Sequence, residues 1–337
     1  MSTPLRVAVV GTGEVSRQVA SDLAITPGAE LYAVSSRTLE GAQAFSDAAG
    51  GHARPYGSYE DCLADTDVDL VYLGTPHATH HALALQAIYA GKHVLVEKPM
   101  TMSAAQAQEL ADAATDAGVF LMEGMWTKFN AVIRRVTQLI AEGAIGEVRS
   151  VRASFGLPFP TDTGSRWRAD LGGSSLLDQG IYPITLARMF LGEALNLTAG
   201  GTVRPDGVDL TGHLTITYPE GRFAQLSWSM VEFLELTASI NGTEGWIVIH
   251  PAFWSPEHAT LTRMTWDALP DVQEIRIPRD GHGFVPMLKS VAETIAAGRL
   301  EHPQHTLADT VAVLGIIDET RARHRPQANR ANGQLQR

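Results

Sequence analysis

Residues 5–16 read LRVAVVGTGEVS, and this stretch decides the fold of the first part of the chain. Leu5 to Val10 form a short, apolar, β-branched run, which predicts a buried strand. The run ends at Gly11 and Gly13, and a helix is predicted over residues 14–25. A strand, a glycine-rich turn and a helix in this order are typical of a cradle for a pyrophosphate group.

The glycines of this turn have separate expected roles. The first permits a tight turn, and the second lets the backbone approach a pyrophosphate on the positive N-terminus of the helix. The third position of the motif, usually glycine or alanine, is Ser16, which is still small enough for helix–strand packing. An ordinary strand-to-helix turn is the alternative interpretation. We expect the cofactor to contact Gly11, Thr12, Gly13, Glu14 and Val15.

Strands and helices alternate along the next hundred residues. Apolar runs predict strands over residues 30–35, 68–76, 93–99 and 119–124. Helical patterns over residues 14–25, 38–49, 81–92 and 103–117 separate them. This alternation is typical of βαβ units. The sequence therefore predicts an α/β protein whose N-terminal part is a Rossmann domain with a doubly wound parallel sheet.

The pattern changes near residue 124. After one predicted helix over residues 130–142 come extended runs rich in Val, Thr, Ser and aromatic residues, several of which alternate apolar and polar side chains. They predict a C-terminal α+β domain with a large, mostly antiparallel open sheet, followed by helices near residues 284–297 and 306–323. We therefore expect a dinucleotide-binding domain over residues 1–124, a substrate-binding and dimerisation domain over residues 125–323, and a flexible tail over residues 324–337.

Composition excludes several classes of protein. The 337 residues carry 26 Lys and Arg against 37 Asp and Glu, a formal net charge of −11, and 45% are hydrophobic. The hydrophobic share excludes a chain that is disordered throughout. The negative charge argues against a nucleic-acid partner, because such proteins usually present a basic face.

Cysteine content and apolar runs predict where the protein works. The one cysteine, Cys62, allows no intrachain disulfide, which fits a reducing compartment. No apolar run reaches the roughly 18 to 20 residues that span a bilayer, and nothing at the start resembles a cleaved signal peptide. We expect a cytoplasmic protein with no membrane partner.

The end of the second predicted strand indicates which dinucleotide binds. An NAD-selective fold usually carries an acidic side chain here to bind the ribose 2′-hydroxyl. This chain has Ser36 and Arg37 instead, and no acid before Glu40. A hydroxyl and a guanidinium suit a 2′-phosphate, so we predict NADP(H), with NAD(H) as a possible second cofactor. The alternative is that Arg37 is merely a solvated residue at a helix start.

Three further segments carry residues suited to chemistry. GTPHATH at 74–80 and VEKPM at 96–100 both lie where a predicted parallel strand ends, and open α/β sheets bind ligands at that edge. The third segment is SRWRADLGGSSLLDQGIYPI at 165–184, whose last part, LLDQGIYPI, places an aspartate and a tyrosine four residues apart, on one face of a helix. These segments add as candidate cofactor contacts Thr75, Pro76, His77, His80, Glu97 and Lys98, and as candidate catalytic residues Lys98, Asp178 and Tyr182.

These residue types suit hydride transfer between a carbinol and a nicotinamide. Hydride leaves or reaches carbon while a proton leaves or reaches oxygen, so a proton carrier is required. Tyr182 could carry it if a nearby ammonium lowers its pKa, and Lys98 could supply that ammonium or donate the proton itself. Asp178 could orient the substrate hydroxyl. The pattern leaves both proton carriers open, and each residue could instead be a core, rim or capping residue.

His77, His80 and His81 raise the question of a metal site. No cluster of carboxylates or cysteines accompanies them in the sequence, so we predict no metal.

Together these motifs resemble a known family. GTGEVS, GTPHATHH, AGKHVLVEKPM and GGSSLLDQGIY are similar to motifs of the glucose–fructose oxidoreductase, inositol dehydrogenase and rhizopine-catabolism (Gfo/Idh/MocA) family. The resemblance spans roughly residues 5–320. It implies a Rossmann domain, a C-terminal domain whose open sheet often forms a dimer interface, and NAD(P)-dependent oxidation or reduction of sugars, cyclitols or related polyols.

The resemblance also implies roles for single residues. Lys98 matches the lysine of the family's EKP segment, and Asp178 matches the aspartate of its D-x-G motif. Tyr182 stands where histidine is commoner, and with MEGMWTKFN at 122–130 it resembles the branch of dimeric trans-dihydrodiol dehydrogenases and D-xylose dehydrogenases. In that branch the tyrosine is the acid/base. The resemblance further implies that Trp126, Arg149 and Phe155 line the substrate or nicotinamide side. It also implies that Trp167 and Arg168 lie near the active site, where we expect them to contact the cofactor.

These observations predict an NADP-dependent oxidoreductase that acts on a carbinol or carbonyl carbon of a sugar or cyclic polyol. Alternatives are trans-dihydrodiol dehydrogenase activity and a non-catalytic NAD(P)-binding regulator. We expect a homodimer, or a tetramer, assembled through the C-terminal sheet.

Overall fold

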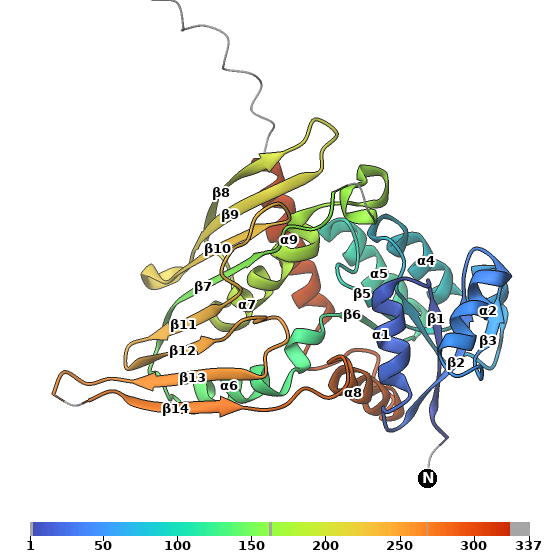
Figure 1. Cartoon of the computed structure of the whole chain (residues 1–337), viewed down its shortest axis with the longest axis horizontal. Helices are drawn as coiled ribbons and strands as arrows, with labels where there is room; N and C mark the ends of the chain where they lie inside the picture. The colour runs from blue at the N-terminus through green and yellow to red at the C-terminus, as the bar shows by residue number, and fades with distance from the viewer. Residues whose placement is uncertain (1–2, 162–163, 268, 324–337) are drawn as a thin grey trace, which may run out of the picture.

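Two sheets, with the helices packed around them, make up the protein (Figure 1). The computed structural model describes residues 3–161, 164–267 and 269–323. The predicted tail over residues 324–337 lies outside the described residues. The α/β fold class predicted from the sequence is confirmed, with a Rossmann-type sheet in the first part of the chain and a larger sheet in the second.

The N-terminal sheet has six parallel strands in the order β3-β2-β1-β4-β5-β6. Its strand order runs outward in both directions from the first strand, as in doubly wound folds, so the edge where the order reverses is a ligand site. The strands are β1 (Leu5–Val10), β2 (Ala29–Ser35), β3 (Arg54–Tyr56), β4 (Leu70–Leu73), β5 (His93–Glu97) and β6 (Leu121–Gly124).

Five helices connect these strands, and their starts follow local sequence rules. Thr38 and Ser103 cap helices by accepting a backbone N–H. One helix begins at His77 rather than at residue 81, because Pro76 is extended and a helix can follow it directly. The pair β3 and α3 was not predicted, because both elements are short. The helices are α1 (Glu14–Leu23), α2 (Leu39–Ala48), α3 (Tyr59–Ala64), α4 (His77–Tyr89) and α5 (Ala104–Ala117).

The second sheet has eight strands in the order β14-β13-β12-β11-β7-β10-β9-β8. The pairing of β7 with β10 is parallel, and the other pairings between described strands are antiparallel. The predicted mostly antiparallel sheet is therefore confirmed. Its strands are β7 (Val148–Gly156), β8 (Asn196–Val203), β9 (Asp209–Thr217), β10 (Phe223–Ser229), β11 (Ala238–Gly242), β12 (Gly245–Ile249), β13 (His258–Arg263) and β14 (Asp271–Arg276).

The last two helices return to the N-terminal sheet, which the sequence did not indicate. Helix α8 (Val285–Ala296) packs against α1 and β2, and its Met287 and Leu288 share an apolar cluster with Val7 and Val9. Helix α9 (Leu307–Arg323) contacts α5 and β6 (Figure 1). The division into domains at residue 124 stays a prediction, since the chain crosses between the two sheets more than once.

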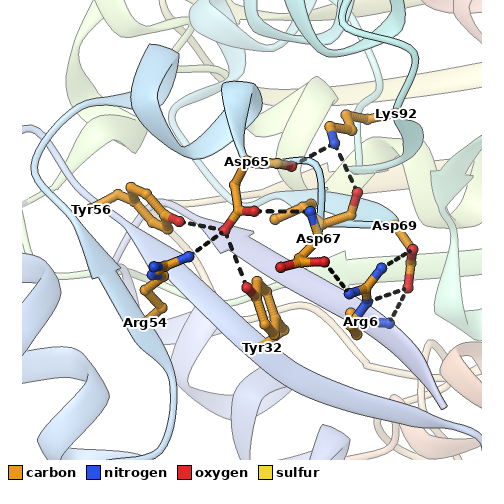
Figure 2. A network of polar contacts seen from close by, with 9 residues as sticks. Arg6, Tyr32, Arg54, Tyr56, Asp65, Asp67, Asp69 and Lys92 are labelled. Carbon is orange, nitrogen blue, oxygen red and sulfur yellow. Dashed lines mark hydrogen bonds and ion pairs between the residues drawn. The ribbon is translucent and has the colours of Figure 1, made fainter. Parts of the chain in front are cut away.

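A polar network joins the strands at the N-terminal edge of the parallel sheet, opposite the ligand edge (Figure 2). At its centre is Asp65, whose carboxylate accepts bonds from Tyr32, Tyr56 and Arg54 and from the Asp67 amide. Burial alone would raise the pKa of Asp65, but these hydrogen bonds lower it to about 2 from its ordinary 3.8. The network therefore stabilises the fold as long as Asp65 is ionised.

We expect Asp65→Asn to lower the free energy of unfolding at pH 7 by on the order of 1 kcal/mol. Because the folded pKa lies below the unfolded one, this stabilisation is complete above about pH 4 and disappears as the pH falls towards 2. Urea unfolding at pH 7 and at pH 3 measures it. A variant that is equally destabilised at both values would contradict the assignment.

Within the described residues, no helix combines the length and the apolar character needed to cross a membrane.

Candidate active site

A cavity of about 690 Å³ opens at the ligand edge of the parallel sheet. Its walls come from the segments that follow β1, β2, β4 and β5, joined by the segment around residue 166 and the start of the helix near residue 178. Fifteen of the predicted site residues line it: Gly11, Thr12, Gly13, Glu14, Val15, Ser36, Arg37, Thr75, Pro76, His77, His80, Glu97, Lys98, Arg168 and Asp178.

The turn after β1 has the shape of a phosphate cradle. Gly11 has a φ of 99°, and a Cβ there would lie 2.7 Å from the Gly74 carbonyl oxygen, so only glycine fits. A Cβ on Gly13 would meet no protein atom within 4 Å, which leaves the space over the start of α1 clear. No side chain caps α1, so its first N–H groups face the cavity side unpaired by a cap. This geometry suits an anionic group.

The end of β2 places two donors on the same wall. Ser36 and Arg37 line the cavity, and Arg37 forms no hydrogen bond or ion pair within the part of the chain that the structure describes. Tyr59 from α3 stands beside Arg37, whose charge opposes the rise that burial causes in the pKa of Tyr59. The cradle and this cation together fit a dinucleotide with a 2′-phosphate.

Lys98 and Asp178 form a buried ion pair in the wall of the cavity. Lys98 Nζ donates to Asp178 Oδ1 and to the Asp178 carbonyl oxygen, each at 2.8 Å. The exposed fractions of the two side chains are only 11% and 14%. Arg166 Nε donates to the other carboxylate oxygen of Asp178. Asp178 is thus bonded by two cations, of which only Lys98 is deeply buried.

The charges of this pair reinforce each other. Burial favours the neutral forms, but the Asp178 carboxylate and the nearby Tyr182 raise the pKa of Lys98 above its usual range. In the same way Lys98 and Arg166 hold the pKa of Asp178 well below its usual range against the effect of burial. Both groups are therefore charged at neutral pH.

Tyr182 lies directly beside this pair. Its ring centroid is 4.9 Å from Lys98 Nζ, and its hydroxyl oxygen accepts a 2.9 Å hydrogen bond from Trp126 Nε1. The sequence offered Lys98 as an ammonium that could lower the pKa of Tyr182. The ammonium does act in that direction, but burial is the larger effect and the pKa of Tyr182 is raised. Tyr182 is therefore a neutral phenol at physiological pH.

The turn before α7 (Ile181–Leu191) brings the aspartate and the tyrosine to the same lysine. The sequence placed both on one α-helical face, whereas residues Leu176–Gly180 form a single π-helical turn that carries Asp178, and Tyr182 follows in α7. Such turns are frequent at functional sites. The carboxylate of Asp209 anchors the turn by accepting bonds from the Leu176 amide and from two serine hydroxyls.

Aromatic side chains surround Tyr182 on the side away from the cofactor cavity. Trp126 stacks on Phe284, with ring centroids 4.6 Å apart, and bonds the tyrosine hydroxyl. The ring of Phe155 lies 5.8 Å from that of Tyr182 and stacks on Trp254 at 3.7 Å. Trp126 and Phe155, which the resemblance assigned to the substrate side, thus stand next to Tyr182. Apolar aromatic faces suit the C–H face of a ring-shaped substrate.

Two predicted site residues lie elsewhere. Arg149 is on β7, where it pairs with Glu147 at 2.8 Å and bonds the Glu220 carbonyl, and it does not line the cavity. The first residues of β7 lie far along the strand from Phe155, so the geometry does not support the substrate contact predicted for Arg149. Trp167 is buried in a separate apolar cluster with Val208 and Met230, because its indole faces away from the cavity.

The structure adds residues that the sequence did not indicate. Tyr59 and Trp254 take part in the site although no motif marked them, and Arg166 does so although it was not named within the segment 165–184. Arg166 is one residue before the predicted Trp167-Arg168 pair, and only the conformation of this segment shows which arginine reaches Asp178. Further unpredicted residues that line the cavity are Gly74, Thr79, Ser165 and Leu171.

The three histidines near the site face separate partners. His77 Nδ1 contacts the Gly172 carbonyl oxygen, the ring of His80 lies between the carbonyl oxygens of Thr75 and Pro99, and His81 pairs with Glu109. No group of three potential metal-ligating side chains occurs among residues 3–161, 164–267 and 269–323.

Family models match both parts of the chain. Residues 5–125 match the model described as an oxidoreductase family with an NAD-binding Rossmann fold. Residues 133–248 match the model of the GFO/IDH/MocA C-terminal domain.

Individual proteins match over nearly the whole length. A trans-1,2-dihydrobenzene-1,2-diol dehydrogenase of Xenopus laevis is 34% identical over 318 residues, which are 92% of this chain and 95% of that protein. A dTDP-3,4-didehydro-2,6-dideoxy-alpha-D-glucose 3-reductase of Actinomadura kijaniata is 32% identical over 95% of this chain and 96% of its own. A crystal structure of a 3-ketoreductase from Actinomadura kijaniata, in complex with NADP and TDP-benzene, superposes with a TM-score of 0.86 at 30% identity, covering 96% and 99% of the two chains.

Proposed function

Since this chain belongs to the Gfo/Idh/MocA family of NAD(P)-dependent oxidoreductases, we propose that it transfers a hydride between NADP(H) and a carbinol or carbonyl carbon of a sugar or cyclic polyol. The observation that carries the proposal is that Lys98 and Asp178 line the same cavity as the dinucleotide cradle, with the ring of Tyr182 directly beside Lys98. Cofactor and proton carrier can then act on one carbon–oxygen bond.

The residues of the cradle would hold the cofactor. The turn at Gly11 and Gly13 and the start of α1 would take the pyrophosphate, and Ser36 and Arg37 would take the 2′-phosphate. NADP(H), when bound there, supplies or accepts the hydride. The reductase structure solved with NADP has the same fold over 96% of this chain, which supports NADP as the cofactor.

Tyr182 is the proposed proton carrier. Its hydroxyl oxygen accepts the Trp126 N–H, which leaves its own proton free to be donated. In the direction of reduction, that proton passes to the substrate oxygen, and the Lys98 ammonium over the ring stabilises the phenolate that remains. In the direction of oxidation, the phenolate takes the hydroxyl proton back.

Lys98 and Asp178 have supporting roles in this proposal. Asp178 holds the ammonium in place by accepting one hydrogen bond at its carboxylate and one at its backbone carbonyl oxygen, and the carboxylate keeps the ammonium charged. The ammonium then acts as a fixed positive charge beside the reacting oxygen, where a buried site makes charge most effective. In the related ketoreductase, variants of one lysine and one tyrosine have been solved, and these two residues are spaced along that chain as Lys98 and Tyr182 are here.

A panel of substrates tests the proposal. The enzyme is mixed with NADP or NADPH and with pentoses, hexoses, their 1,5-anhydro forms, inositols or trans-dihydrodiols, and the nicotinamide absorbance is followed. Turnover of a sugar or cyclic polyol with NADP(H) is the expected result. Turnover of the dihydrodiol alone would support the alternative that the Xenopus laevis relative suggests by its name.

A non-catalytic regulator is the second alternative. Such a protein needs the dinucleotide cradle but no proton carrier, whereas Lys98, Asp178 and Tyr182 are all present and in mutual contact here. Tight binding of NADP without turnover of any member of the panel would favour the regulator.

Arg37→Asp tests the choice of cofactor. A charge-assisted contact to the 2′-phosphate is lost, and the new carboxylate repels that phosphate, so we expect the affinity for NADP relative to NAD to fall by about 10- to 100-fold. Titration of both cofactors by fluorescence measures the ratio. Arg17→Asp is the matched control, since Arg17 is exposed on α1 and does not line the cavity. An unchanged ratio in Arg37→Asp would refute the phosphate contact.

The proposal extends to assembly and location. Helices α6 (Ala131–Ala141), α7 and α9 pack on the eight-stranded sheet, and the alternate residues of its strands, such as Arg152, His213 and Gln225, are exposed. We infer a homodimer or tetramer formed through this exposed side, which light scattering tests. The buried, unpaired Cys62 fits the cytoplasm.

A further inference from the structure

The loop that carries Lys98 is held by buried polar side chains on every side. Glu97 Oε2 accepts the Lys98 amide at 3.1 Å, and His80 Nδ1 lies 2.8 Å from the Pro99 carbonyl oxygen. Glu123 Oε1 accepts the Met100 amide at 3.0 Å. Pro99 itself has no amide hydrogen to donate. The amides of its two neighbours, Lys98 and Met100, both donate to carboxylates, which satisfies these buried backbone groups.

Glu123 belongs to a different strand from the loop that it holds. It stands near the end of β6, its side chain is 1% exposed, and its partner in the ladder is Val96 on β5. Its second oxygen lies 3.1 Å from His305 Nε2 and accepts the Thr310 hydroxyl at 3.3 Å. Burial would raise the pKa of Glu123, but His305, the Met100 amide and Thr310 lower it, so the carboxylate is charged.

The contacts continue outward from Glu123. His305 Nδ1 lies 3.1 Å from Lys128 Nζ, which can only donate, so the ring proton is on Nε2 and points at Glu123. Lys128 also donates to Asp309 Oδ2 at 3.0 Å. One continuous hydrogen-bond network therefore connects β6, the turn after it and the start of α9, and it reaches the loop that carries Lys98.

We propose that Glu123 is a positioning residue for Lys98: its charged carboxylate, oriented by His305 and Thr310, bonds the Met100 amide and so fixes the loop from which the lysine reaches Asp178. This inference rests on the proposed function, because it assigns the position of Lys98 a role in the reaction. Glu123 does not line the cavity and acts only through the loop.

Glu123 also influences the second carboxylate of the loop. Burial and the charge of Glu123 raise the pKa of Glu97, which is about 7. The other groups that face Glu97 are Tyr72 of β4, Lys98 and Tyr182 of α7. Protonation of Glu97 weakens its bond to the Lys98 amide, so kcat is expected to fall on the acid side of neutrality.

Glu123→Gln keeps the shape of the side chain and removes its charge. We expect kcat to fall about 10- to 100-fold, as small misplacements of a catalytic group do, with KM and the Kd for NADP within about twofold of wild type. The negative charge of Glu123 raises the pKa of Glu97, so removing that charge lowers the pKa of Glu97. The decline of kcat on the acid side of its pH profile should therefore shift to lower pH. Steady-state kinetics from pH 5 to pH 9 on the full-length enzyme measure both effects.

Asp65→Asn is the matched control. Asp65 is also a shielded carboxylate of the same sheet with several hydrogen bonds, but it lies at the opposite edge (Figure 2). It should change the stability while leaving kcat and the position of the acid limb as in wild type. If Glu123→Gln, like this control, keeps the wild-type kcat and the wild-type position of the acid limb, Glu123 has a structural role only.

Glu123→Asp distinguishes the effect of the carboxylate charge from the effect of side-chain length. It also replaces Glu123→Gln as the test if the glutamine variant does not fold. It keeps the charge but withdraws the carboxylate by one methylene from the Met100 amide, so kcat should fall while the acid limb stays in place. Wild-type kcat in a folded Glu123→Asp would overturn the proposal. Absence of turnover in the wild-type enzyme would instead contradict the proposed function, so the two failures are distinguishable.

Discussion

Replacing Lys98 with methionine lowers kcat by about a thousandfold or more while the affinity for NADP changes little, if the proposed function is correct. Methionine has nearly the length of lysine but no charge, so Asp178 keeps only Arg166 as a cationic partner. The phenolate that forms on Tyr182 then lacks the ammonium at 4.9 Å from its ring. Steady-state turnover and fluorescence titration of NADPH measure the two effects separately.

Lys92→Met is the matched control for this variant. Lys92 is also a buried lysine of the parallel sheet, where it donates to the carbonyl oxygens of Asp65 and Val68 at 2.6 and 3.0 Å, but it lies at the edge away from the cavity (Figure 2). We expect it to reduce stability and to leave kcat unchanged. Full activity in Lys98→Met, or an equal loss in both variants, would contradict the assignment of Lys98.

Replacing Tyr182 with phenylalanine tests which group carries the proton. If the hydroxyl does so, kcat falls by about 10² to 10⁴-fold, the usual contribution of general acid–base catalysis. If Lys98 carries the proton, most of the activity remains, since phenylalanine preserves the ring under the ammonium. Binding of NADP should be retained in either case, because Tyr182 does not line the cofactor cavity.

The pH dependence of kcat and a control variant at a second tyrosine give further tests of the role of Tyr182. Burial raises the pKa of Tyr182 above its ordinary 10.0, so carbonyl reduction that depends on its proton should show no loss from Tyr182 ionisation up to that pH. Tyr218→Phe is the control, because the Tyr218 hydroxyl is buried and has no hydrogen-bond partner among the described residues. We expect its kcat to equal that of wild type.

Local sequence rules were sufficient to predict which segments line the cavity. The residues of the cradle and the ends of β2, β4 and β5 were all predicted, because in a parallel sheet the carboxyl end of every strand lies on the same edge. Fixing the strand order therefore fixes which loops meet. Ser36, Thr75 and Lys98 come together although long stretches of sequence separate them.

The substrate half was predicted less completely, because it depends on packing between distant elements. The resemblance assigned Trp126 and Phe155 to the substrate or nicotinamide side, which stays a prediction, and the structure places both beside Tyr182. The resemblance also assigned Arg149 to that side, but Arg149 lies six residues before Phe155 on β7, pairs with Glu147 and does not line the cavity. Trp254 had no marking motif, since a tryptophan in a loop is usually part of the core.

The sequence by itself determined the fold class and the dinucleotide turn, and it singled out Lys98, Asp178 and Tyr182 as candidates, because each depends on a short motif and on the period of the surrounding strands and helices. Only the tertiary structure decided the charge states of these residues and the partners that orient them. Burial keeps Tyr182 neutral against the field of Lys98. Glu123 reaches the catalytic loop because β6 and α9 converge beside it. Burial and contacts between distant segments arise only when the whole chain is packed.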